Sequence, residues 1–190
     1  MKNKVVCIVG MAGAGKTTVA DEFVAQGFAY LRFGQVTIDE IKKRRLEVSE
    51  ASERKIREEL RKKYGMSAFA LLNSVKIDRL LKESNVVVDG LYSWSEYKML
   101  KERYGDSLFI VAAYAPPVLR YQRLVGRVAE NDPKKRFRPL TEKEAKARDL
   151  ADIESAEKGG PIAMADFTVL NLGAKEELIE QVRGVLSKIK

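Results

Sequence analysis

Residues 10–17 constrain this chain more than any other part of the sequence. They read Gly-Met-Ala-Gly-Ala-Gly-Lys-Thr, which fits the Gly-x-x-x-x-Gly-Lys-Thr pattern in full, and they directly follow an apolar run at residues 5–9. The apolar run predicts a buried strand, and the amphipathic residues after the motif predict a helix. Glycines are required where successive backbone N–H groups wrap around a polyphosphate, because a Cβ would obstruct the loop. The segment is therefore interpreted as a phosphate-binding loop.

The two last positions of the motif carry specific chemistry. Lys16 is expected to reach the β- and γ-phosphates of a nucleotide, and Thr17 to offer its hydroxyl to Mg²⁺. The helix that begins near Gly15 would direct its positive dipole end at the bound anion. The loop alone thus predicts binding of a nucleotide polyphosphate.

Composition narrows the chemistry further. The chain has 190 residues, which suits a single domain over residues 1–190, and its net charge of +8 favours an anionic partner. It contains no histidine, so imidazole bases and histidine metal ligands are excluded. Its one cysteine, Cys7, cannot form an intramolecular disulfide, and no apolar run is long enough to span a membrane. We therefore expect a cytoplasmic protein with no membrane segment, either a monomer or a homodimer.

The region after the first helix predicts a short strand followed by a group of helices. Residues 28–33 alternate like a strand, a helix with Thr37 as its cap should follow, and residues 50–63 and 66–82 have helical periods. Three helices between two strands exceed a simple crossover. Residues 36–64 are therefore predicted to form a mobile flap beside the phosphate loop, as in phosphoryl-transfer enzymes that bind an acceptor.

A second informative point is Asp89. It ends the β-branched run at residues 86–88, which predicts a buried parallel strand. Ligands in open α/β sheets bind beyond the carboxyl ends of strands, so Asp89 is expected next to Thr17, where it could support Mg²⁺ or accept the proton of an attacking hydroxyl. The alternative is an aspartate that only caps the following segment.

Arginines gather in the second half of the chain. A further strand is predicted at residues 108–113, and a helix is expected to begin at Pro116 and Pro117. The arginines on or after this helix are Arg120, Arg123, Arg127, Arg136, Arg138 and Arg148. We interpret the cluster as an arginine-bearing lid, centred on residues 127–141, that closes over the transferred phosphate. A solvated basic face or a nucleic-acid patch is the alternative. Residues 159–161 are expected to break the chain before a fifth strand at 167–170 and a terminal helix at 174–189.

Several motifs together resemble one known family over nearly the whole chain. The phosphate loop, Val-Val-Val-Asp-Gly ending at Gly90, Arg123 to Arg127, Arg148-Asp149 and the segment from Ala165 to Gly173 are similar to the P-loop nucleotide kinases, most of all to the archaeal adenylate-kinase-like and dephospho-CoA-kinase-like group. The resemblance implies an α/β three-layer sandwich with a five-stranded parallel sheet, an ATP and Mg²⁺ donor site, a helical flap that binds the acceptor, and a lid.

The resemblance also implies roles for individual positions. Lys16, Asp89, Arg123 and Arg127 would be catalytic, and Thr17 and Asp89 would support the metal. The residues expected to bind ATP are Gly10, Ala12, Gly13, Ala14, Gly15, Lys16, Thr17, Thr18, Asn171 and Gly173. Those expected to bind the acceptor are Arg32, Gln35 and Arg148. One departure stands out: Gln35 follows Gly34 where relatives often have an aspartate, so a flap carboxylate is missing.

The leading hypothesis is an ATP-dependent kinase that phosphorylates a small phosphorylated acceptor, most simply a nucleoside monophosphate. Dephospho-CoA kinase-like activity and a regulatory P-loop ATPase are the alternatives. A GTPase would need an Asn-Lys-x-Asp tetrapeptide, which the sequence lacks. Nucleic-acid binding ranks last but stays open, because the basic residues are spread over acidic helices and no aromatic-rich single-strand motif occurs.

Overall fold

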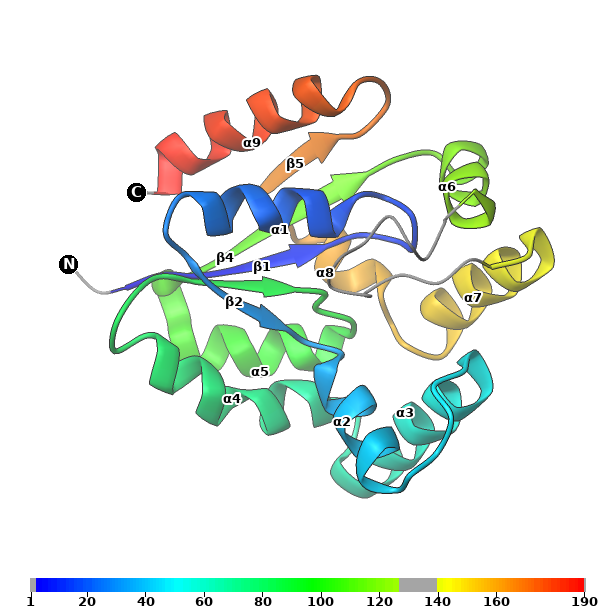
Figure 1. Ribbon diagram of the computed structural model, residues 1–190. Coiled ribbons are helices and arrows are strands. Elements are labelled where there is room, and N and C mark those ends of the chain that lie inside the picture. The colour runs from blue at the N-terminus through cyan, green and yellow to red at the C-terminus, as the bar shows by residue number, and fades with distance from the viewer. Residues whose placement is uncertain (1–2, 127–139, 190) are drawn as a thin grey trace.

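A parallel β-sheet lies at the centre of the computed structural model, which describes residues 3–126 and 140–189 (Figure 1). Its five strands lie in the order β2-β3-β1-β4-β5, and neighbouring strands pair in parallel. Their bounds are β1 Val5–Val9, β2 Ala29–Arg32, β3 Val86–Asp89, β4 Leu108–Tyr114 and β5 Phe167–Leu170. All the carboxyl ends therefore share one edge of the sheet, the edge at which open α/β sheets bind ligands.

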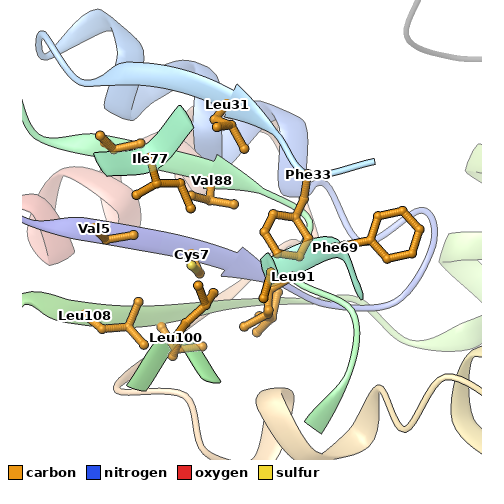
Figure 2. Close-up of a cluster of buried hydrophobic side chains, with 14 of the residues drawn as sticks. Val5, Cys7, Leu31, Phe33, Phe69, Ile77, Val88, Leu91, Leu100 and Leu108 are labelled. Atoms are coloured by element: carbon orange, nitrogen blue, oxygen red, sulfur yellow. The ribbon is translucent and has the colours of Figure 1, made fainter. Parts of the chain in front are cut away.

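β1 is the central strand and is buried on both faces, which explains its unbroken apolar sequence. Val5 and Cys7 pack into the core on one face, and Val6 and Ile8 pack into the core on the other, as the two-residue period of a strand requires. Figure 2 shows the first core, in which Cys7 is surrounded by aliphatic and aromatic side chains. The sole cysteine is thus a buried core residue.

Helices cover both faces of the sheet and complete the three layers (Figure 1). On one face lie α1 (Lys16–Ala25) and α9 (Lys175–Ile189), whose apolar side chains share a core with Val6 and Ile8. On the other lie α4 (Ala68–Leu80) and α5 (Trp94–Tyr104), which pack around Cys7. The Ser93 hydroxyl accepts from the Glu96 N–H at 3.0 Å and the Glu96 carboxylate accepts from the Ser93 N–H in return, so α5 begins with a capping box.

The remaining helices gather beyond the carboxyl edge, toward which the strand arrowheads point in Figure 1. Helices α2 (Gln35–Lys43) and α3 (Glu50–Tyr64) occupy the region predicted as a helical flap. Across from α3 lie α6 (Pro117–Val125) and α7 (Glu142–Glu154), and α8 (Gly159–Ala163) follows. The predicted lid, with Arg127, Arg136 and Arg138, falls almost entirely on residues 127–139 and so lies outside the described residues.

Two local expectations are wrong. Thr37 does not cap α2, because the helix already begins at Gln35 with Gly34 as its cap and Thr37 is buried within it. Gly159, Gly160 and Pro161 do not break the chain but form α8, which is possible because a proline in the first turn of a helix needs no N–H partner there. In both cases residues that were expected to lie outside a helix form its first turn.

Within residues 3–126 and 140–189, no helix has the length and apolar character that crossing a membrane requires.

Candidate active site

The phosphate loop joins β1 to α1 in a backbone conformation that only glycine adopts easily. Gly10, Gly13 and Gly15 have φ values of 138°, 80° and 98°. A Cβ on Gly13 would lie 2.7 Å from the backbone oxygen of Arg120, and one on Gly15 would collide with the side-chain amide of Asn171. The loop is therefore closely packed against its neighbours on α6 and after β5.

Lys16 begins α1 and lies folded back over the loop. Its Nζ donates to the backbone oxygens of Gly10 at 2.9 Å and Met11 at 3.0 Å. Burial and, to a smaller extent, the charge of Lys158 lower its pKa to about 7, while Asp89 and Asp152 act in the opposite direction. A phosphate placed at the loop would supply the negative charge that this ammonium lacks.

Asp89 arrives beside Thr17, as expected from the end of β3. The Thr17 hydroxyl donates to Oδ2 of Asp89 at 3.0 Å, and the Tyr30 hydroxyl donates to the same oxygen at 3.0 Å. Hydroxyl and carboxylate oxygens are the hard donors that Mg²⁺ prefers, and the ion usually takes few protein ligands because phosphates and water complete its shell. The Thr17 hydroxyl and the Asp89 carboxylate therefore fit a Mg²⁺ that accompanies a nucleotide. In the described part of the chain, no group of three or more histidine, cysteine, aspartate or glutamate residues could hold a metal ion by itself.

A first pocket, of about 410 Å³, lies over the phosphate loop and is called the donor pocket below. Its lining residues are Gly13, Gly15, Lys16, Thr17, Thr18, Arg123, Asn171, Gly173, Lys175 and Leu178. The Asn171 amide donates to the backbone oxygen of Ala14 at 3.0 Å, and the Arg123 guanidinium donates to the backbone oxygen of Asn171 at 3.0 Å. These two bonds attach the segment after β5 to the loop and form one wall of the pocket.

A second pocket, of about 300 Å³, opens between α3 and α7 and is called the acceptor pocket below. Five arginines line it, together with four carboxylate residues and Tyr92. The arginines are Arg32, Arg54, Arg57, Arg61 and Arg148, and the acidic residues are Glu53, Glu58, Glu144 and Asp152. Guanidinium groups bind phosphate and carboxylate through paired hydrogen bonds, so the pocket suits an anionic ligand.

Helix α3 contributes three of these arginines because positions i, i+3 and i+7 share one helical face. Arg54 pairs with Glu58 at 2.9 Å and Arg57 pairs with Glu53 at 3.2 Å along the helix. Arg61 packs its guanidinium over the Phe69 ring, 5.7 Å from the centroid, and its Nε is buried with no hydrogen-bond partner within the described residues. Burial of this N–H donor without an acceptor is energetically unfavourable, and a hydrogen bond to a ligand or an ordered water would offset that free-energy cost.

Helix α7 ties the acceptor side to the phosphate loop through a buried ion pair. Arg120 of α6 holds Asp149 through two contacts, at 2.8 Å and 2.6 Å, and its Nη1 also donates to the backbone oxygen of Ala12 at 3.1 Å. Both side chains are buried, so removal of either partner is expected to cost roughly 3 to 5 kcal/mol. Arg120, predicted within the lid cluster, thus has a structural contact with the loop.

A second buried ion pair lies one turn further along. The Lys158 Nζ contacts Oδ2 of Asp152 at 2.5 Å and lies 5.2 Å from the centroid of the Tyr92 ring. Asp152 and Tyr92 both line the acceptor pocket, whereas the charges of Lys158 and Asp152 both act on Lys16. This pair therefore couples the acceptor pocket to Lys16 through its charges.

The structure brings most of the predicted site residues together. Lys16, Thr17, Thr18, Gly13, Gly15, Arg123, Asn171 and Gly173 line the donor pocket, with Asp89 bonded to Thr17. Gly10, Ala12 and Ala14 are buried parts of the loop itself. Arg32 and Arg148 line the acceptor pocket, but Gln35 does not, because its amide donates to Oδ1 of Asp39 at 2.9 Å. Arg127 lies outside the described residues.

Sequence reasoning missed the α3 arginines, Tyr30, Tyr92 and the Lys158–Asp152 pair. The arginine spacing of α3 was a usable signal, because residues three, four and seven apart share a face of a helix. No comparable pattern marked Lys158 or Tyr92, since their contacts depend on how α7, α8 and the segment after β3 come together in space.

Comparison with known proteins identifies the class to which this fold and loop belong. Residues 6–149 match the family described as AAA domain. Two relatives match along almost their full length: a UPF0200 protein of Thermococcus gammatolerans is 34% identical over 97% of this chain and 95% of its own, and UPF0200 protein TK1334 of Thermococcus kodakarensis is 33% identical over 97% of both. The chain belongs to this AAA domain family and, with these relatives, to the UPF0200 proteins.

Solved structures show the same fold at low sequence identity. A shikimate kinase from Bacteroides thetaiotaomicron superposes with a TM-score of 0.59 at 15% identity, covering 98% of both chains. A gluconokinase from Sinorhizobium meliloti gives 0.58 at 14% identity, covering 99% of this chain and 93% of that one. The predicted fold class is confirmed: the protein has the P-loop kinase fold with a five-stranded parallel sheet.

Proposed function

We propose that this protein is a phosphotransferase that moves the γ-phosphoryl group of ATP to a small phosphorylated acceptor, most simply a nucleoside monophosphate. One observation carries the proposal: charged residues of the arginine-lined acceptor pocket act on Lys16 of the phosphate loop. The donor pocket contains the phosphate loop, and the acceptor pocket contributes Asp152 and Arg148, whose charges both act on the Lys16 ammonium. In this proposal that ammonium would neutralise the phosphoryl group during its transfer.

In this proposal the donor pocket holds ATP. The loop N–H groups and Lys16 would bind the β- and γ-phosphates, and Thr17 with Asp89 would support the Mg²⁺ that neutralises them. Asn171 and Gly173 also line this pocket, and the nucleoside would lie beside them. Mg²⁺ would supply charge neutralisation at the β- and γ-oxygens.

The acceptor pocket would hold the second substrate by its phosphate. Five arginines converge there from β2, α3 and α7, and each of these elements is fixed by the core or by an ion pair. A guanidinium group binds a monophosphate ester through paired, charge-assisted hydrogen bonds, which a neutral sugar does not offer. The arginines therefore support a phosphorylated acceptor over the acceptors that the names of the structurally similar kinases suggest.

Catalysis would come from positioning and charge. Phosphoryl transfer needs donor and acceptor oxygens in line and a positive surrounding for the equatorial oxygens, with little covalent chemistry from the protein. Lys16 on the donor side and Arg148 on the acceptor side would provide this surrounding, and Arg123 would add to it from α6. No histidine is needed, in agreement with a sequence that has none.

The test is transfer of label from γ-labelled ATP to a panel of acceptors. The panel contains the common nucleoside monophosphates, dephospho-CoA, gluconate and shikimate, with a reaction without acceptor as control. Rapid labelling of one or more monophosphates is the expected result. Slow ATP hydrolysis that no acceptor accelerates would favour a regulatory ATPase, and labelling of gluconate or shikimate alone would contradict the assignment of the arginine pocket.

A further inference from the structure

Tyr30 lies on β2 at a position from which it reaches the carboxylate of Asp89 on the neighbouring strand. In the β2–β3 pairing, Arg32 lies opposite Asp89 and Tyr30 opposite Val87. Residues two apart on a strand share a face, so Tyr30, Val87 and Asp89 lie on the face that α1 covers. The Tyr30 hydroxyl donates to Oδ2 of Asp89 at 3.0 Å from this side.

The two hydrogen bonds to Asp89 are unequally distributed over its oxygens. Oδ2 accepts from both Thr17 and Tyr30, each at 3.0 Å, whereas Oδ1 accepts no hydrogen bond within the described residues. Two donors on one oxygen, from α1 and from β2, fix the plane of the carboxylate more firmly than one donor can. The arrangement leaves the second oxygen free for a ligand.

Thr17 alone would be a poor anchor for this carboxylate. Its hydroxyl oxygen is the group expected to face a cation, so its position would change with the metal, whereas Tyr30 is held in the sheet and packs against the core beneath α1. Outer-shell partners of this kind fix the orientation of groups around a metal and typically change metal affinity by roughly 10- to 100-fold when removed.

We propose that Tyr30 is a positioning residue for the magnesium-supporting carboxylate: it holds Asp89 through Oδ2 so that Oδ1 remains available to a water molecule of the Mg²⁺ shell. This inference rests on the proposed function for its biological meaning. It assigns to a residue of an outer sheet strand a role in metal-dependent nucleotide binding, and that role can be measured without any acceptor.

The test compares Tyr30→Phe with Tyr104→Phe. Tyr104 is a matched control, because its hydroxyl donates to Oδ1 of Asp78 at 3.0 Å on α4, and neither residue lines the donor pocket. ADP binding is measured by calorimetry with Mg²⁺ and with EDTA. The expected result is that Tyr30→Phe lowers the gain in ADP affinity given by Mg²⁺ about tenfold and leaves metal-free ADP binding unchanged. Tyr104→Phe should change neither quantity.

Thermal unfolding of the same proteins distinguishes positioning from simple support of the fold. Each variant loses one hydroxyl bonded to a carboxylate, so both midpoints should fall by a similar small amount. If Tyr30→Phe keeps the full Mg²⁺ gain, or if the wild-type protein binds ADP equally with and without Mg²⁺, the positioning role is wrong. If Tyr30→Phe does not fold, 4-methylphenylalanine introduced at position 30 alone fills the volume of the hydroxyl without donating a hydrogen bond. It should lower the gain in ADP affinity given by Mg²⁺ about tenfold, and an unchanged gain would overturn the role.

The proposed function fails separately. A wild-type protein that transfers phosphate to no acceptor contradicts the transferase assignment, but the Mg²⁺ gain and its loss in Tyr30→Phe are measured on ADP binding alone. Conversely, active transfer by the wild-type protein together with an unaltered Mg²⁺ gain in Tyr30→Phe would retain the function and reject the positioning role.

Discussion

The donor and acceptor pockets are built by different means. The donor pocket is formed mainly from backbone: a loop of glycines between β1 and α1, with neighbours that leave no room for side chains at Gly13 and Gly15. The acceptor pocket is formed from long charged side chains on helices beyond the sheet edge. A pocket formed by backbone N–H groups can recognise the phosphates that all nucleotides share. A pocket formed by side chains can acquire a different ligand specificity when those residues are substituted. The donor pocket thus defines the class of reaction, and the acceptor pocket defines the substrate.

Each half also contains one buried group whose pKa is near neutrality. Burial lowers the pKa of Lys16 to about 7 in the donor half, and burial raises the pKa of Glu96 to about 7 beneath the acceptor half. Glu96 accepts from the backbone N–H groups of Tyr92 and Ser93, so it supports the segment that carries Tyr92 into the acceptor pocket. The two halves should therefore respond to pH in opposite ways.

The largest effect is expected in the donor half. Lys16→Met removes the ammonium that would neutralise the transferred phosphate, and kcat/KM should fall by about 10³-fold. Lys175→Met is the control, because Lys175 also lines the donor pocket but is exposed and should change kcat/KM less than about threefold. A coupled assay of ADP formation measures both. An equal fall in kcat/KM in the two variants would show that Lys16 acts only through the overall positive charge of the pocket and not through its position.

The next effect concerns stability beneath the acceptor half. Because the pKa of Glu96 is raised in the folded protein, the native state retains a proton that the unfolded chain releases, and stability falls as pH rises from about 4.5 to about 7. Glu96→Gln keeps the hydrogen-bond geometry of the capping box without this proton. Its stability relative to wild type should rise by about 3 kcal/mol between pH 4 and pH 8.

Urea denaturation at the two pH values measures this change. Glu102→Gln serves as control, because Glu102 lies exposed on the same helix and should leave the pH dependence as in wild type. A Glu96→Gln curve parallel to wild type across the range would mean that Glu96 is ionised in the folded protein.

A smaller effect is expected from an acceptor-side arginine. Arg148→Met should raise the KM of the acceptor roughly 30-fold, within the range for loss of a charge-assisted contact, and leave the KM of ATP within about twofold. Arg103→Met is the control, since Arg103 pairs with Asp78 at the surface of α5 and lines neither pocket. A parallel rise of both KM values in Arg148→Met would contradict the separation of the two halves.

The smallest effect is a proton taken up on nucleotide binding. Lys16 must be charged to bind phosphate, yet with a pKa of about 7 it is charged in only about a tenth of the molecules at pH 8. Binding of ADP at pH 8 should therefore take up close to one proton, and binding at pH 6 almost none. Calorimetry in buffers of different ionisation enthalpy measures the uptake, and Lys16→Met should abolish it. Uptake that persists in Lys16→Met would assign the proton to another group.

The contrast between the donor and acceptor pockets also explains which features could be predicted from the sequence. The phosphate loop, the end of β3 at Asp89 and the capping box at Ser93 and Glu96 depend on neighbours a few residues away or on the period of a strand, so patterns in the chain are enough. Gln35 was expected to bind the acceptor because of its position after Gly34; in the structure its amide donates to Asp39 in the next turn of α2, and it does not line the acceptor pocket.

The acceptor pocket was less predictable because it is assembled over long sequence distances. Arg32 and Arg148 lie in elements separated by most of the chain, and the position of each depends on how α3 and α7 come to face one another across the sheet edge. Lys158 is the clearest case. Its charge is tolerated in the interior because Asp152, six residues earlier, pairs with it and the Tyr92 ring lies against it, and no local sequence pattern predicts these contacts.

The most direct test of two pockets that meet at one transferred phosphate is the affinity of a single molecule that fills both. A dinucleoside pentaphosphate, with adenosine at one end and the nucleoside of the accepted monophosphate at the other, joins the donor and acceptor ligands covalently. It should bind the wild-type protein at least about 100-fold more tightly than ADP does, because the second pocket then binds at high effective concentration. Both Lys16→Met and Arg148→Met should lose most of that gain. An affinity no higher than that of ADP would contradict the account.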